Sequence, residues 1–360
     1  MAISGNKGEW SEIYTLFKLL GEGKVHAGDA NMRKLKLYYP ILNIIREENS
    51  RFEYKTDEQH HLIIIDSDGE IFAKISMDKF LQEAEKLLLE IINNKSSSFK
   101  IPTTEAFMHE VGCSKLKAPS NDKADIHIVI HDLRTGMTPL LGFSIKSQLG
   151  SPSTLLNAGK PTNITFRVSG ERLTNKDIQD INNIEEHLQR INAIYEKGCA
   201  LEYYDIEHNT FKNNLLFLDT CMPQFIADCL IADSLPYSST SDIRDCVSQV
   251  ALKNPFKFNG SDVYEFYAHK MKILLIDAAL GMTAAKEWWG KYDANGGYLV
   301  VRKDGDIVCY HFYNRNDIED YLFNNTKFER ASRTRYQYGV LYQKGKETFI
   351  KLNLQIRFKK

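Results

Sequence analysis

The sequence of 360 residues lacks the features that mark several common classes of protein. Its six cysteines show no Cys-x-x-Cys spacing, which argues against a zinc site or a disulfide framework and predicts reduced thiols in the cytoplasm. No apolar run approaches the roughly 20 residues that a membrane-spanning helix needs, and the first residues show no signal-peptide pattern. These absences predict a soluble globular protein of one or two domains.

A strong net charge is missing too, because 46 lysines and arginines nearly balance 47 aspartates and glutamates, which gives −1. The charge is nevertheless uneven: residues 327–360 contain ten lysines and arginines and two glutamates, a net +8 that leaves −9 for the other residues. Phosphate contacts dominate the affinity of proteins for DNA, so one basic end suits a surface that faces a duplex. A solvated basic tail is the alternative. Interleaved aromatic and aliphatic residues instead favour a twisted hairpin that turns at Lys344-Gly345-Lys346.

Two expected strands in the middle of the chain bring together an acid, a hydroxyl and a lysine. These strands cover residues 123–128 and 141–147. Because side chains alternate between the two faces of a strand, a hairpin would place Asp125, Ser144 and Lys146 on one side of a sheet. An acid that can hold a divalent metal ion, beside a lysine that can steady a water, is suited to hydrolysis of a phosphodiester.

This arrangement resembles the metal-dependent nuclease core whose motif is Pro-Asp, a spacer, and then Asp/Glu-x-Lys. The sequence departs from that motif twice, with Ala124 at the position of the proline and Ser144 at the position of the second acid. The serine matters more, because Mg²⁺ prefers carboxylate and water oxygens as ligands. Short motifs also match by chance. The alternative interpretation is a polar outer face on a half-buried hairpin.

Apolar residues at helical spacing predict an amphipathic helix over residues 10–20. Glu12 flanks its apolar side, and Gly8 precedes it at a Gly-x-x-x-Glu spacing that is common in this nuclease superfamily, where the glutamate points into the metal site. Glu12 would then supply the carboxylate that Ser144 lacks. The alternative is a surface glutamate favoured by the helix dipole, a role that suits Glu9 better. The sequence leaves open which of the two enters the site.

Further segments extend the resemblance over nearly the whole chain. They are Gly5–Tyr14, Ser144–Ala158, Thr162-Asn163 and Lys351–Phe358. Together they resemble the HpaII family of type II restriction endonucleases, which belong to the nuclease superfamily above. The resemblance implies a Mg²⁺-dependent endonuclease that cuts double-stranded DNA at a short palindromic site similar to CCGG and leaves a 5′-phosphate and a 3′-hydroxyl.

The resemblance also implies roles for individual residues. We expect Asp125, Glu12 and the backbone carbonyl of Ile145 to hold Mg²⁺. Lys146 would steady the attacking water or the charge that develops on the phosphate, and Ser144 would contact a water or a phosphate oxygen. Arginine pairs with guanine through two hydrogen bonds, so the C-terminal arginines are candidates for reading bases. The expected DNA contacts are Ser147, Gln148, Ser151, Ser153, Asn157, Arg330, Arg333 and Arg335.

The expected partners follow from the expected target. A palindromic site implies a homodimer with two-fold symmetry. Protection of the host's own sites implies a cytosine DNA methyltransferase as a functional partner. Two rival functions stay open: a repair nuclease that nicks branched or damaged DNA regardless of sequence, and a DNA-binding protein whose catalytic core has decayed, which Ser144 would fit.

The expected fold is α+β or α/β, with a restriction-endonuclease-like mixed sheet flanked by helices. We expect a nuclease core over residues 1–170, a helical region over 171–295 and a strand-rich basic recognition part over 296–360. The predicted strands are 35–45, 51–55, 61–65, 70–75, 163–168, 298–302 and 307–313, and the predicted helices are 10–20, 80–93, 104–111 and 314–322. Residues 175–198 and 214–282 are predicted to be helical regions, with an interruption near 236–241. Gly21 and Gly23 are expected to end the first helix, and Asp66–Gly69 is expected to form a hairpin turn.

Overall fold

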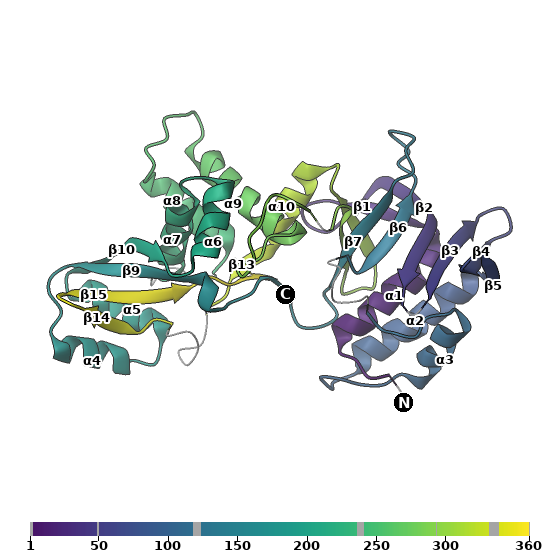
Figure 1. Cartoon of the computed structure of the whole chain (residues 1–360), viewed down its shortest axis with the longest axis horizontal. Helices are drawn as coiled ribbons and strands as arrows, with labels where there is room; N and C mark the ends of the chain where they lie inside the picture. Colours follow the sequence, from purple (N-terminus) through teal and green to yellow (C-terminus); the bar gives the residue numbers. More distant parts are fainter. Residues whose placement is uncertain are drawn as a thin grey trace. The chain divides into compact units, whose positions relative to one another are not determined.

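The computed structural model describes residues 3–48, 50–117, 124–235, 241–292, 294–330 and 338–359. The chain forms two compact units, each assembled from separate stretches of sequence (Figure 1). The first unit contains the chain up to Ser153 together with Tyr292–Tyr321, and the second contains Thr154–Lys291 and Leu322–Lys359. Strands and helices occur in both units, which confirms the expected α+β class.

The first unit is built on a mixed sheet that has nine strands within the described residues, in the order β1-β12-β11-β7-β6-β2-β3-β4-β5. The strands are β1 (Lys24–Gly28), β2 (Lys34–Glu47), β3 (Arg51–Asp57), β4 (Leu62–Ser67), β5 (Glu70–Ser76), β6 (Ile126–Ile130), β7 (Leu140–Ser147), β11 (Gly297–Val301) and β12 (Ile307–His311). Strand β1 pairs in parallel with β12 and also antiparallel with the first half of β2. The strands β1, β12, β11, β7, β6 and β2 therefore form a closed ring of paired strands.

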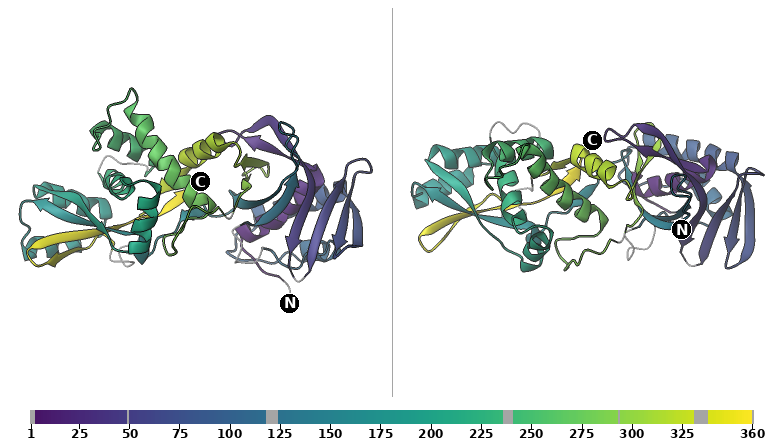
Figure 2. Two further views of the ribbon diagram at one scale, coloured as in Figure 1. Left: turned by 45° about the horizontal axis from the view of Figure 1, so that its top comes forward. Right: turned by 90° about the horizontal axis from the view of Figure 1, so that it is seen from above.

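The helices of the first unit include α1 (Lys7–Glu22), α2 (Met77–Asn93) and α3 (Pro102–Glu110), which pack beside the sheet (Figures 1 and 2). Helix α1 ends at Gly23, whose φ of 63° is left-handed. Gly21 lies inside the helix, so the prediction that it ends the helix is wrong. A Cβ at Gly21 would come within 2.9 Å of the backbone nitrogen of Leu81, so this glycine allows α1 and α2 to approach closely.

Most elements predicted from hydrophobic spacing are confirmed. Strands β2 to β5 and helices α2 and α3 lie over the predicted ranges, although β1 was not indicated by the pattern. Asp68 (φ 52°) and Gly69 (φ 92°) form the predicted turn between β4 and β5. Positive φ at both central residues is what a tight hairpin turn requires.

Strands β11 and β12 join the sheet from far along the sequence. Strand β11 runs parallel to β7, with Tyr298 opposite Ser144. The observed units therefore differ from the expected boundaries at residues 170 and 296, because residues 292–321 belong with the first 153. Strand β9 (Asn163–Gly170) lies in the second unit, although the expected nuclease core extended to residue 170. An apolar run indicates a buried strand but not the strand with which it pairs.

The second unit contains two smaller sheets, with strand orders β10-β9-β15-β14 and β13-β16-β8, and several helices. Besides β9, the elements are β8 (Thr154–Leu156), the 3-10 helix η1 (Lys160–Thr162), α4 (Asn175–Asn183), α5 (His187–Glu196), β10 (Cys199–Ile206), α6 (Asn209–Leu218), α7 (Met222–Asp233), α8 (Ile243–Lys253), α9 (Val263–Leu280), β13 (Thr326–Phe328), β14 (Leu341–Lys344), β15 (Glu347–Asn353) and β16 (Ile356–Phe358). Helix α10 (Arg315–Asn325) contains the point where the chain passes from one unit to the other. The predicted turn at Gly345 (φ 65°) is confirmed.

The structure bears on two features that the sequence argued against, which are disulfide bonds and membrane-spanning helices. All six cysteines are free thiols, as expected. Among the described residues no single helix is long and apolar enough to cross a membrane, and α6 and α7, bent by 102°, pass such a test only as a pair.

A buried polar cluster lies within the second unit. His187 Nε2 is 3.1 Å from the Ser234 hydroxyl and 3.2 Å from the Tyr338 hydroxyl. Burial lowers the pKa of His187 to about 3, and the positive charges of Arg330 and Arg190 act in the same direction. The imidazole is therefore neutral in the folded chain at pH 7.

The lowered pKa of His187 predicts a loss of stability in acid. Below pH 6.5 the unfolded chain binds a proton that the folded chain does not, so the free energy of unfolding falls as the pH drops from 6.5 towards 3. The contribution of this one group is at most about 1.4 kcal/mol per pH unit. Urea unfolding of the parent and of His187→Asn at several pH values measures it: the parent should lose more stability than the variant between pH 6.5 and 4.5. Equal losses would contradict the assignment.

Candidate active site

The hairpin of β6 and β7 brings the predicted acid and hydroxyl together. Ile126 pairs with Phe143, and the Asp125 amide donates to the Phe143 carbonyl at 2.8 Å, so Asp125 stands opposite Ser144. One Asp125 carboxylate oxygen accepts hydrogen bonds from the Ser144 hydroxyl at 3.0 Å and from the Ile145 amide at 2.6 Å. On the first strand the expected alternation holds: Ile126, Ile128 and Ile130 are buried, whereas Asp125 is partly exposed. On β7 burial does not alternate, because Phe143 and Ser144 are both buried.

Lys146 completes a chain of three polar side chains. Its ammonium donates to the Ser144 hydroxyl oxygen at 2.9 Å, while that hydroxyl donates to Asp125. The same Lys146 nitrogen lies 5.0 Å from the centre of the Tyr298 ring, which β11 places beside β7. Asp125, Ser144 and Lys146 are therefore adjacent, as the sequence indicated.

The environment of Lys146 alters its protonation. Burial lowers its pKa from the ordinary lysine value, and the negative charges of Asp125 and Glu12 oppose that shift. A lysine with a lowered pKa holds its proton less tightly and can take part in proton transfer closer to neutral pH. Because the charge of Glu12 affects the pKa of Lys146, helix α1 brings this carboxylate within electrostatic range of the lysine.

The two glutamates of α1 have different surroundings. Glu9 forms a capping box with Asn6. The Asn6 side-chain oxygen accepts a hydrogen bond from the Glu9 backbone N–H at 3.1 Å, and the Asn6 backbone N–H donates to the Glu9 carboxylate at 2.9 Å. Lys117 also contacts Glu9 at 3.1 Å. Burial acts to raise the pKa of Glu9, but the hydrogen bonds and the charge of Lys117 leave it lowered. Glu9 is thus held at the helix N-terminus, and Glu12 is the glutamate whose charge acts on Lys146.

A contact between hydroxyls joins α1 to β7 beside the site. The Ser11 and Ser147 hydroxyl oxygens lie 2.8 Å apart, one residue before Glu12 and one residue after Lys146. Ser11 is fully buried, and its hydroxyl also donates to the Lys7 carbonyl at 2.7 Å. This contact aligns the helix with the strand that carries the lysine. The sequence analysis did not identify Ser11 or Tyr298, and their positions depend on packing between distant segments.

The acidic side chains that act on Lys146 offer carboxylate oxygens, which are the kind of ligand that Mg²⁺ prefers. The described residues contain no group of three or more histidine, cysteine, aspartate or glutamate side chains close enough to hold a metal. The two carboxylates that act on Lys146 are Asp125 and Glu12. Mg²⁺ is often held by only one or two carboxylates together with waters and a substrate phosphate, whereas a structural zinc ion needs four nitrogen or sulfur ligands. The predicted contribution of the Ile145 carbonyl stays a prediction.

The other residues predicted to contact DNA are spread over both units. Ser147 is engaged with Ser11, and the Gln148 amide nitrogen lies 3.3 Å from the Met32 sulfur. Ser151 and Ser153 line a cavity in the first unit. Asn157 is exposed in the second unit.

The predicted arginines of the basic end cannot all be compared with the structure. Arg333 and Arg335 lie outside the described residues. Arg330 makes an ion pair with Asp233, which is 2% exposed, with Nε 2.9 Å and Nη2 3.1 Å from its two carboxylate oxygens. Reading a guanine with Arg330 would require this pair to break. Its role in reading bases stays a prediction, and the ion pair counts against it.

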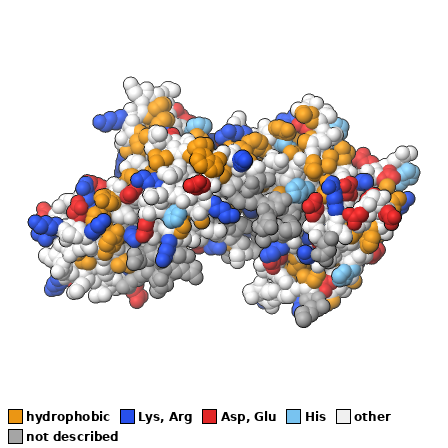
Figure 3. All heavy atoms as spheres, viewed as in Figure 1, with side chains coloured by type: hydrophobic (Ala, Val, Ile, Leu, Met, Phe, Trp, Pro, Cys, Tyr) orange, Lys and Arg blue, Asp and Glu red, His pale blue; other side chains and the backbone are white. Residues whose placement is uncertain are grey.

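The basic end as a whole is partly neutralised within the second unit. Of its described cations, Arg330 and three more pair with acids: Lys351 with Glu207 at 3.1 Å, Arg357 with Glu329 at 2.8 Å, and Lys359 with Asp242 at 2.5 Å. On the face shown in Figure 3, cationic and acidic side chains are interspersed. The charge excess counted along the sequence therefore does not translate directly into a basic surface.

Comparison with known proteins covers nearly the whole chain. A model of the HpaII restriction endonuclease family matches residues 6–358. The type II restriction enzyme HpaII of Haemophilus parainfluenzae is 44% identical over 358 residues, which cover 99% of this chain and 98% of that protein. No solved structure matches the chain.

The charge of Asp125 acts on Lys146 and predicts a measurable change in the pKa of the lysine. Burial lowers the pKa of Lys146, and the negative charge of Asp125 raises it. Asp125→Asn removes that charge, so the pKa of Lys146 should fall further. The neutral amine is the form that reacts with an acylating reagent. The rate of Lys146 acylation, followed by mass spectrometry as a function of pH, should therefore have its midpoint at a lower pH in the variant. The exposed Lys74 in the same sample corrects for reagent concentration. An unchanged or higher midpoint would show that Asp125 does not act on Lys146.

Proposed function

The chain belongs to the HpaII family of restriction endonucleases, and from this premise we propose how its site cuts DNA. As a member of that family it is a type II site-specific DNA endonuclease. The proposed reaction is hydrolysis of a phosphodiester in double-stranded DNA at a short palindromic site similar to CCGG, leaving a 5′-phosphate and a 3′-hydroxyl. The observation that carries the catalytic assignment is the hydrogen-bonded chain from Lys146 through Ser144 to Asp125.

Restriction endonucleases generally use divalent metal ions, and we propose that this chain uses Mg²⁺. Asp125 and Glu12 would hold the ion, with the Ile145 carbonyl as a third oxygen. When bound, the ion would supply positive charge to the phosphate that is attacked. Asp125 is suited to this role because the Ser144 hydroxyl and the Ile145 amide fix its carboxylate.

Lys146 is proposed to act on the attacking water. Burial lowers its pKa, so its ammonium can release and recover a proton more readily than an ordinary lysine. The ammonium would also stabilise negative charge that develops on the phosphate oxygens. Ser144 keeps the lysine and the aspartate in contact by accepting from one and donating to the other.

Serine in place of the second acid is proposed to shift that acid to helix α1. The Ser144 hydroxyl bridges Asp125 and Lys146 but carries no charge. Glu12, on the neighbouring helix, supplies a second negative charge that acts on Lys146. This division explains how the site could retain two carboxylates without one at position 144.

The proposed target has consequences for partners. A palindromic site suits a homodimer, because a two-fold axis presents the same surface to both strands. A cytosine methyltransferase would protect the same sites in the host DNA, and both enzymes would act in the cytoplasm. Ser147, Gln148, Asn157, Arg330, Arg333 and Arg335 stay proposed DNA contacts, together with Ser151 and Ser153.

Replacement of Lys146 tests the catalytic role. Lys146→Ala should lower cleavage of unmethylated plasmid DNA in Mg²⁺ by at least about 100-fold, as expected for loss of a group that stabilises transition-state charge. DNA binding should be nearly unchanged. Lys74→Ala, on the exposed edge strand β5, is the matched control and should cut like the parent. Sequencing the ends of the parent's fragments gives the site.

Each outcome of this digestion has a distinct meaning. Discrete fragments that vanish with Lys146→Ala support a site-specific nuclease with this lysine in its active site. Cleavage by Lys146→Ala at the parent rate would remove the lysine from the mechanism. Nicks or a smear from the parent would favour a repair nuclease, and intact DNA with retained binding would indicate a decayed core.

The metal requirement tests Glu12 against Glu9. Glu12→Gln removes a proposed ligand charge, so half-maximal cleavage should require about tenfold or more Mg²⁺, a typical effect of losing an interaction at a metal site. Glu9→Gln, three residues earlier on the same helix, disturbs the capping box and should change thermal stability instead. A titration of Mg²⁺ with both variants distinguishes them. A shift seen with Glu9→Gln and not with Glu12→Gln would reverse the assignment.

A further inference from the structure

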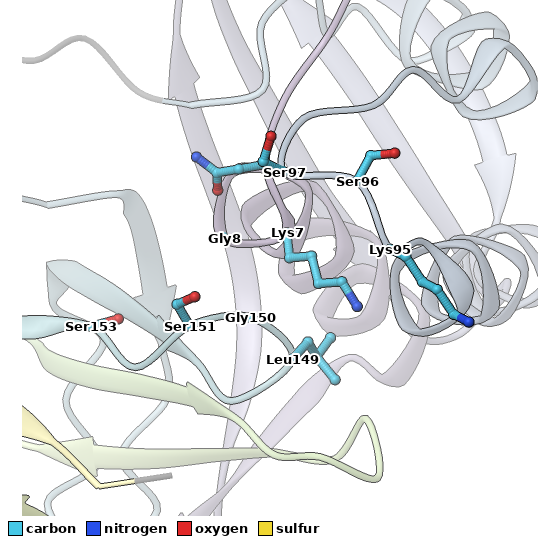
Figure 4. A pocket seen from close by; sticks show the side chains of 10 residues that line it. Lys7, Gly8, Lys95, Ser96, Ser97, Leu149, Gly150, Ser151 and Ser153 are labelled. Atoms are coloured by element: carbon cyan, nitrogen blue, oxygen red, sulfur yellow. The ribbon is translucent and has the colours of Figure 1, made fainter.

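A polar cavity of about 710 Å³ lies within the first unit beside the catalytic strand. Three segments form its walls: the start of α1, the loop after α2 and the loop after β7 (Figure 4). Its lining residues are Asn6, Lys7, Gly8, Lys95, Ser96, Ser97, Leu149, Gly150, Ser151 and Ser153.

The lining of this cavity is cationic and rich in hydrogen-bond donors. It contains two lysines and four serines and no carboxylate. Lys7 is half-buried, and its ammonium donates to the Ile92 carbonyl at 3.2 Å, which uses one of its three N–H groups. In the described part of the chain neither Lys7 nor Lys95 forms an ion pair, whereas Lys79 and Lys86 on α2 pair with glutamates at 2.6 and 2.7 Å.

Two of the three segments that form the cavity also belong to elements that carry candidate catalytic side chains. Lys7 and Glu12 lie on α1, and Gly150 follows Lys146 at the end of β7. A Cβ at Gly150 would lie 3.2 Å from the Lys7 Cβ, so the loop after β7 passes close to the first turn of the helix. Figure 4 shows the Lys7 side chain extending between Lys95 and Leu149. The Ser11–Ser147 contact at 2.8 Å holds these two elements together between the cavity and the site.

We propose that this cavity binds a backbone phosphate of the DNA strand near the phosphate that is cut, with Lys7 and Lys95 as the charged contacts. This inference rests on the proposed function, because it takes duplex DNA as the ligand. Two ammonium groups without carboxylate partners and several hydroxyls suit the oxygens of a phosphodiester. Such contacts carry no sequence information but set the register of the DNA on the protein. The serines at the cavity position the phosphate, and Lys7 and Lys95 supply the attraction.

Salt dependence of DNA binding tests the proposal. The ligand is a duplex that spans a cleavage site mapped for the parent, and Lys146→Ala serves as the binding background so that no cutting interferes. Each phosphate contact that is lost should reduce the slope of log K against log salt concentration by about 0.9. Lys7→Gln and Lys95→Gln should each show that reduction, and the double variant about twice as much. The preference for the site over random duplex should stay the same.

Matched variants separate the charge from other effects. Lys7→Arg and Lys95→Arg keep the charge and should retain the parent slope. Lys74→Gln removes an exposed lysine from β5 and should leave the slope unchanged. A duplex with one neutral methylphosphonate near the cut should bind the background protein more weakly, and Lys7→Gln should no longer sense that substitution.

The outcomes distinguish this proposal from the proposed function. A parent that does not cut DNA contradicts the function itself. A parent that cuts and binds, with Lys7→Gln and Lys95→Gln variants that keep the full salt slope, overturns the phosphate site alone. A slope reduced equally by Lys74→Gln would show a general charge effect and would overturn it as well. Thermal melting of each variant confirms that it is folded.

Discussion

The active-site geometry depends on one register in the sheet. Ile126 must pair with Phe143 for Asp125 to stand opposite Ser144 and receive its two hydrogen bonds. A slip of one residue would turn Ser144 and Lys146 to the other face. That slip would turn the fully buried Phe143 out of the apolar core, so the core opposes it. The polar site is thus positioned by the packing of apolar side chains beneath it, and β11 supports the same strand from its other edge.

Helix α1 serves both the core and the site. Trp10, Phe17 and Leu20 are fully buried, and they hold the helix in place. The Ser11–Ser147 contact then sets the helix beside the end of β7. This placement sets the positions of Glu12 and Lys7, because both residues lie on the helix that packs against β7. The helix brings the charge of Glu12 to bear on Lys146, where the strand itself carries the neutral Ser144.

Charge counted along a sequence differs from charge displayed by a fold. In the basic C-terminal end, Lys351, Arg357 and Lys359 pair with acids of their own unit. The cationic lining of the cavity comes instead from Lys7 and Lys95, which belong to the part of the sequence that carries a net −9. The charge of a lysine that pairs with a carboxylate is largely neutralised. A lysine without such an ion pair is therefore better able to attract phosphate.

The sequence by itself indicated most of the local elements and the candidate catalytic residues, because hydrophobic spacing and turn residues act over a few neighbours. It indicated the helix that carries Glu12, the hairpin of Asp125 and Lys146, and the turns at Gly69 and Gly345. Only the tertiary structure decided that β11 rather than β9 completes the catalytic sheet, and that Glu12 rather than Glu9 acts on Lys146. The assignment of residues 292–321 to the first unit also came from it. These choices depend on complementarity between surfaces far apart along the chain, which no local pattern encodes.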